Sequence, residues 1–259
     1  MLKLCLFFFA TLTYALGSII PHHAEYTIQL SDRQKSHVKD VTGTLTIDVR
    51  DTGEGWTFEQ RCLVYVKTFA GNTDTFRTTI ASWESKDGKY YTFTVTSSCN
   101  EQIVECIHGH ATADESHAGT AIYQQPESYL VSLPSGTLFP LQYLNKILKT
   151  VTRGELNLSN QTIFDGTNDN QEAVEVNLTI TPLKPDLVLN NKYLIDTDKA
   201  WSLQMAFFQS GSNEIDPEYE LTQTILKSGI ILSMKMPMAY GEEAFRTKVS
   251  LRDVKVYSG

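Results

Sequence analysis

The chain has 259 residues, of which 41% are hydrophobic and 20% are charged, as in an ordinary globular protein. Its net charge of −8 excludes a nucleic-acid-binding protein, because that class needs a basic surface. The same acidity argues against passive docking on anionic lipid.

Residues 1–17 predict a cleavable signal peptide. Lys3 supplies a positive start, residues 4–16 form a mostly apolar run, and Ala15 and Gly17 are small residues suited to a cleavage site. The run is shorter than the ~20 residues of a membrane-spanning helix, and a retained anchor is the alternative. We therefore expect an exported protein in which residues 18–259 form a single domain.

Three cysteines follow the predicted cleavage site, namely Cys62, Cys99 and Cys106. An exported protein meets an oxidising compartment, where disulfides form. Cys99 and Cys106 flank a plausible hairpin turn at residues 100–101 and are the best candidates for a pair. The alternative is that all three are buried thiols.

Alternation of apolar and polar residues dominates the chain and predicts half-buried strands. β-branched and aromatic content supports the same assignment. The predicted strands are 44–50, 56–66, 90–96, 174–180, 200–209, 219–226, 230–236 and 245–252. Turn signals lie between several of them, including Asp87–Gly88 and Ser228–Gly229. Regular short strands with such turns indicate a mainly antiparallel, all-β barrel or sandwich.

One segment, near residues 140–152, breaks this pattern. Its apolar residues recur with helical spacing, Pro140 suits the first helical position, and Gly154 suits the residue past the end. These apolar residues are Leu141, Leu144, Ile147, Leu148 and Val151. We predict an amphipathic helix that covers one end or face of the sheet.

Cys106, His108 and His110 alternate along a strand-like segment and would therefore point to one face. Such side chains suit zinc or copper. However, ligands on one strand rarely complete a tetrahedron unaided, and Gly109 predicts a bulge that would disturb their alignment. They are weak metal candidates, and we predict neither a metal nor another cofactor.

Glu218 and Glu220 are the most suggestive carboxylates, since a glycosidase needs two of them at a defined separation. The alternative is that they are solvated charges at a strand edge. The sequence contains no nucleophile elbow, phosphate-binding loop or zinc-protease motif. We therefore predict no catalytic residue and no enzyme.

A series of short motifs, in order along the chain, resembles the EipB family of bacterial cell-envelope integrity proteins. The most specific are residues 133–140 (LPSGTLFP) and, beyond the predicted helix, residues 164–166. Residues 24–30, 41–47, 54–56, 201–208 and 217–220 agree in order. The residues that carry the motifs are Trp56, Pro134, Gly136, Phe139, Pro140, Phe164, Asp165, Gly166, Trp201, Pro217, Glu218, Tyr219 and Glu220.

The resemblance implies a spiral-like or distorted β-barrel in the periplasm, decorated by one or two short helices. Members of the family usually carry a cysteine just before the Glu-Gly-aromatic turn, which we expect to bond a later cysteine. Here that position is Gly53 and no cysteine follows Cys106. The bridge cannot form, so packing must supply the stabilisation that it would provide.

Three functions remain open. The resemblance implies a non-enzymatic scaffold that supports envelope integrity through a periplasmic protein partner, for which a tetratricopeptide-repeat protein is a candidate. A closed β architecture with few free edges would suit that role. The second function is a carrier of lipid or lipoprotein acyl chains in the barrel interior, to which Tyr91, Phe93 and Val95 could contribute unless they fill a packed core. The third and least supported is an envelope glycan hydrolase that uses Glu218.

Overall fold

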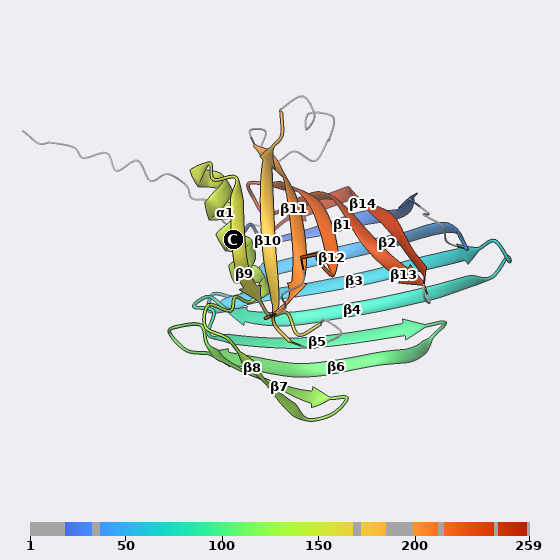
Figure 1. Ribbon diagram of the computed structural model, residues 1–259. Coiled ribbons are helices and arrows are strands. Elements are labelled where there is room, and N and C mark those ends of the chain that lie inside the picture. Colours follow the sequence, from blue (N-terminus) through green and yellow to red (C-terminus); the bar gives the residue numbers. More distant parts are fainter. Residues whose placement is uncertain are drawn as a thin grey trace, which may run out of the picture.

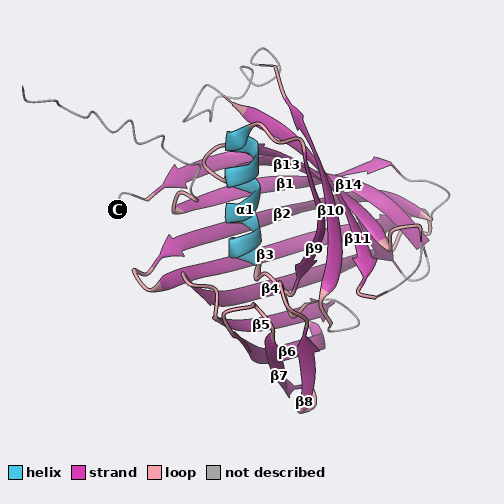
Figure 2. Ribbon diagram, turned by 60° about the vertical axis from the view of Figure 1, so that its left-hand side comes forward, coloured by secondary structure: helices cyan, strands magenta, loops and turns pink. Residues whose placement is uncertain are grey.

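The computed structural model describes residues 19–32, 37–167, 172–184, 199–211, 215–240 and 243–257. The predicted signal peptide lies outside these residues. Within them, 14 strands form one antiparallel sheet that curls around one helix, which lies on the concave face (Figures 1 and 2). No helix of this described part is long and apolar enough to cross a bilayer.

The elements follow the chain in simple order. They are β1 (His22–Asp32), β2 (Val38–Asp51), β3 (Gly55–Thr68), β4 (Thr73–Ser85), β5 (Tyr90–Cys99), β6 (Gln102–Ala113), β7 (Gly119–Gln125), β8 (Tyr129–Leu133), α1 (Pro140–Arg153), β9 (Asn157–Ile163), β10 (Val174–Pro182), β11 (Ala200–Gln209), β12 (Tyr219–Leu226), β13 (Ile231–Tyr240) and β14 (Glu243–Val256). All eight predicted strands are confirmed, and β11 and β12 have the predicted bounds.

The predicted helix is confirmed as α1. Pro140 is its first residue, and Gly154 ends it with a φ of 79°, in the left-handed region that glycine adopts most readily. The N–H of Gly154 donates to the carbonyl of Val151 over 3.1 Å. The apolar stripe is buried in the core of the curled sheet, so the helix fills the interior rather than an outer face.

Among the described residues, the hydrogen-bonded ladder does not close into a complete barrel. The strand order runs β8-β7-β6-β5-β4-β3-β2-β1-β14-β13-β12-β11-β10-β9, which leaves β8 and β9 as edges. The sheet curls back on itself through side chains instead. Tyr240 of β13 packs edge-on against Phe76 of β4, with ring centroids 6.2 Å apart. The expected spiral-like barrel with few free edges is therefore present, but its backbone ladder is open among the described residues rather than closed as expected.

Two groups of buried apolar residues follow from this curl. The larger lies between α1 and the concave face of β1–β3 and β10–β14. The smaller lies under β5–β8, where these strands cover the segments before α1 and after β9. One continuous sheet supplies both groups.

The expected disulfide between Cys99 and Cys106 is not formed. Across the β5–β6 hairpin, Cys99 pairs with Gln102 and Cys106 pairs with Thr96, so the two residues lie on different rungs. The thiols of Cys62, Cys99 and Cys106 are all free. Burial raises the pKa of the Cys62 thiol to about 11.

Candidate functional site

The two most specific sequence motifs meet beside α1. Leu138 forms a parallel bridge with Ile163 at the end of β9. The Leu138 N–H donates to the Thr162 carbonyl over 2.9 Å, and the Phe164 N–H donates to the Leu138 carbonyl over 3.0 Å. Residues 133–140 and 164–166 are therefore joined by backbone hydrogen bonds, which fix the start of α1 next to the end of β9.

An aromatic cluster anchors this junction to the sheet. Phe139 stacks on Tyr91 of β5 with centroids 5.0 Å apart, and Phe164 packs edge-on against Phe93 at 5.7 Å. The Tyr91 hydroxyl donates to the Asp165 carbonyl over 3.0 Å. At Gly166, whose φ is 71°, a Cβ would lie 2.6 Å from the Phe93 ring. The motif residues thus position α1 and pack the fold rather than present reactive groups.

The N-terminus of α1 has an unusual cap. Phe139 occupies the cap position and has no side-chain oxygen to accept the free backbone N–H groups. Glu84 of β4 replaces it, because its carboxylate accepts from the Leu141 N–H over 2.8 Å and from the Gln142 N–H over 2.7 Å. Burial raises the pKa of Glu84 to about 7, although the two N–H donors act to lower it.

A cavity of about 310 Å³ lies between α1 and the concave face of the sheet. Its volume falls near the lower end of the range for small-molecule sites. Aliphatic, thioether and aromatic side chains form most of its wall, and polar groups are few. The apolar residues are Phe58, Ile80, Leu141, Leu144, Ile147, Met205, Leu221 and Ile231; the polar ones include Gln60, Ser82, Gln223, Asp165 and Thr167.

Tyr143 of α1 is the cavity-lining residue with an unpaired polar atom. The residue is 6% exposed, and its hydroxyl oxygen has no hydrogen-bond partner among the described residues. Burial raises the pKa of Tyr143 well above its usual value, so the hydroxyl stays protonated and can donate. A buried donor without a partner costs about 1–3 kcal/mol, which a ligand with an acceptor would offset.

The sequence indicated only part of this cavity. Of the three residues that could contribute to an interior site, Tyr91 lines it and Phe93 and Val95 do not. All three belong to the packed apolar group under β5–β8, which was the alternative. Glu84 and Tyr143 were missed. A lone glutamate in a strand and a tyrosine in an apolar helical stripe have no distinctive sequence signal.

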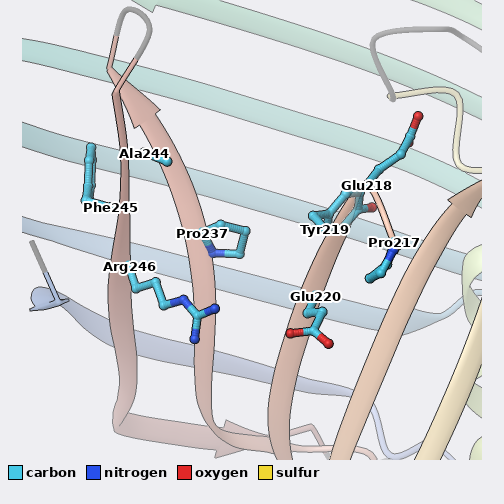
Figure 3. Close-up of a pocket in the computed structure, with 8 residues that line it drawn as sticks. All are labelled: Pro217, Glu218, Tyr219, Glu220, Pro237, Ala244, Phe245 and Arg246. Atoms are coloured by element: carbon cyan, nitrogen blue, oxygen red, sulfur yellow. The ribbon is translucent and has the colours of Figure 1, made fainter. Parts of the chain in front are cut away.

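Glu218 and Glu220 line a second groove of about 400 Å³, to which β12, β13 and β14 all contribute residues (Figure 3). Both residues are exposed, and their carboxylates point in different directions. The groove arises because β12 pairs with β13 only as far as Thr222 and Lys235. Beyond that point the groove contains Pro237, which has no N–H to extend a ladder. The carboxylates do not form the facing pair that a glycosidase requires.

Cys106, His108 and His110 share the outward face of β6, as predicted from their spacing. Each has a neighbour of its own: Cys106 contacts Gln125, His108 contacts Thr94, and His110 stacks on a tyrosine. The β6–β7 register shifts between His108 and Gly109, but the extra residue is Gln124 of β7, so the predicted disturbance of the three side chains is absent. Among the described residues, no three His, Cys, Asp or Glu side chains are arranged to hold a metal ion.

The remaining motif residues lie in turns and packing positions. Gly136 turns the chain before α1 with a φ of 84°, and Pro134 accepts a hydrogen bond from the Thr137 hydroxyl. Trp201 is buried in β11. Trp56 is half-buried in β3, with the Lys86 ammonium 5.5 Å from its ring centroid. Tyr219 stacks on Phe207, and Pro217 lines the groove of Figure 3.

Comparison with known proteins agrees with this architecture. A crystal structure from Brucella abortus, of a beta-barrel-like protein of the domain of unknown function DUF1849, is similar with a TM-score of 0.79 and 20% sequence identity. The match covers 93% of this chain and 99% of the other. No curated protein matches the chain. The model of the EipB-like family matches residues 13–258, and the chain therefore belongs to the EipB-like family.

Proposed function

We propose that this protein is an exported, non-enzymatic binding protein of the cell envelope that holds an apolar chain between α1 and the concave face of its sheet. The observation that carries the proposal is the apolar cavity, whose wall includes Tyr143, a residue with a buried and unpaired hydroxyl. Of the functions considered from the sequence, an acyl-chain carrier in the periplasm fits this arrangement best.

The chemistry of the cavity wall defines the ligand class. Apolar side chains from α1 and from β3, β4, β11, β12 and β13 line the space, so they favour methylene groups over polar ligands. The Tyr143 hydroxyl can donate one hydrogen bond, which suits the carbonyl or carboxylate of a fatty acid or acyl ester. The expected ligand is therefore a lipid acyl chain with an oxygen acceptor near one end.

Filling the cavity is expected to weaken binding. The probe is cis-parinaric acid, a fluorescent fatty acid, titrated into the purified chain. Leu144→Trp places a bulky indole ring in the cavity. It should weaken binding by at least about tenfold, which corresponds to a loss of about 1.4 kcal/mol in binding free energy. Leu156→Trp is the matched control, because Leu156 is 54% exposed outside the cavity and its replacement should leave the affinity unchanged.

Removal of one oxygen atom from Tyr143 gives a second, independent test. In Tyr143→Phe, the unfolding free energy of the ligand-free protein should rise by about 1 kcal/mol, since an unpaired buried hydroxyl is lost. The affinity for the fatty acid should fall by about tenfold in the same variant. Equal affinity in the wild type, Leu144→Trp and Tyr143→Phe would contradict the proposal, as would the absence of any binding to the wild type.

A second candidate function is the protein scaffold that the family resemblance implies. The observation that favours it is the sheet edge at β8, which is open within the described residues. A tetratricopeptide-repeat protein remains the expected partner on the resemblance alone. If no acyl chain binds and the chain still captures an envelope protein, this candidate replaces the first.

A further inference from the structure

We propose that the free edge of β8 binds an extended segment of a partner protein, which adds a fifteenth strand to the sheet. β8 pairs with β7 through residues 129–133, and no other described strand pairs with its opposite edge. A strand edge presents unpaired backbone N–H and C=O groups, which an extended peptide satisfies by forming a ladder. This inference does not depend on the acyl-chain proposal.

The two edges of the sheet differ in a way that points to β8. At β9, Asn160 has a φ of 52°, the ladder shifts register opposite Val176, and Leu138 already occupies the outer side of Ile163. Such irregularities are the usual protection of an edge against added strands. The ladder of β8 with β7 has no register shift, and the strand contains no proline and no charged residue.

The two faces of β8 differ in polarity. Leu130 and Ser132 are on the outward face, and Leu130 is 69% exposed. Tyr129 and Val131 alternate with them toward the apolar group under β5–β8 and are only partly buried. A neighbouring strand would cover Val131 with apolar side chains on one face, and Leu130 and Ser132 with small polar or β-branched ones on the other. The occupant should therefore carry apolar side chains at alternate strand positions.

Charged residues near the free edge of β8 favour particular residues at the two ends of the partner segment. Exposed carboxylates lie at both ends of β8, Glu127 before it and Asp114 at the turn that meets the following segment, whereas Glu115 of that turn is paired with Lys89. A partner strand with basic residues at its ends fits this distribution. A second copy of the chain fits poorly, since the chain carries a net charge of −8 and a five-residue strand buries little of the area that a stable dimer needs.

The test uses a fluorescein-labelled synthetic peptide of alternating valine and threonine with lysine at both ends. Fluorescence anisotropy measures its affinity for the purified chain, and amide hydrogen exchange maps the contact. We expect slower exchange in residues 129–133 on binding. Leu130→Lys should weaken binding by at least about tenfold, because an edge lysine blocks strand addition. Leu156→Lys, beside the other edge, is the control and should bind as the wild type does.

Two further peptides test separately whether binding depends on a backbone ladder and whether it depends on the charges at the peptide ends. A version with a central proline should bind at least about tenfold more weakly if a backbone ladder forms. A version with glutamate ends should do the same if the carboxylates select the flanks. Protection outside β8, equal binding of the proline peptide, or no effect of Leu130→Lys would overturn the proposal. So would a wild-type dimer in sedimentation that Leu130→Lys dissociates, because the occupant would then be a second copy.

Discussion

Phe164→Ala is expected to lower the free energy of unfolding by about 3–5 kcal/mol, the usual cost of removing a buried aromatic ring. Phe164 is fully buried, and its ring contacts Phe93 and Tyr91 of β5 and Tyr123 of β7. Its loss would open a space where the end of β9 joins the sheet. Denaturation by urea, followed by tryptophan fluorescence, measures the change.

Two glycine-to-alanine substitutions test whether the junction around Phe164 is tightly packed. Gly166 and Gly136 both have left-handed backbones, with φ values of 71° and 84°, so alanine strains each by about 1 kcal/mol. Only at Gly166 would the added Cβ meet another group, the Phe93 ring at 2.6 Å, which adds about 1–3 kcal/mol. At Gly136 nothing lies within 4 Å. Equal costs for the two variants would show that the junction is not tightly packed.

The second large effect concerns Glu84, which we expect to make the protein less stable as pH rises from about 5 to 7. Burial raises the pKa of Glu84 from 4.5 to about 7, so the folded state binds its proton more tightly than the unfolded state does. The resulting stabilisation is complete below pH 4.5 and is lost as pH rises through 7. By linkage, the loss amounts to about 2–3 kcal/mol.

Variants at Glu84 isolate this contribution. In Glu84→Ala, the Leu141 and Gln142 N–H groups lose their acceptor, so stability at pH 5 should fall by about 2–3 kcal/mol. Glu84→Gln retains one acceptor oxygen and should lose less. Both variants should lack the wild-type decrease between pH 5 and 7, whereas Glu220→Gln, at an exposed carboxylate, should retain it. If the stability of the wild type followed the same pH dependence over this interval as that of Glu84→Gln, the assignment would be contradicted.

Local patterns account for the elements that were predicted. The alternation in β10 and β14 and the helical spacing in α1 each place apolar residues on one face, and burial of that face follows from the hydrophobic effect. β4, β7, β8 and β9 were not assigned as strands. β9 is mostly polar, and β7 and β8 are short, so pairing with neighbours rather than their own pattern makes them strands.

The sequence by itself determined the all-β class, the position of the helix and the family resemblance, because these depend on residue order and short-range periodicity. Only the tertiary structure decided which groups meet. Glu84 caps a helix 57 residues further along the chain, and Tyr143 faces a cavity because the sheet curls around α1. The open edge at β8 likewise depends on where that curl stops. Such contacts join residues that are distant in sequence, and no local pattern of apolar and polar residues specifies them.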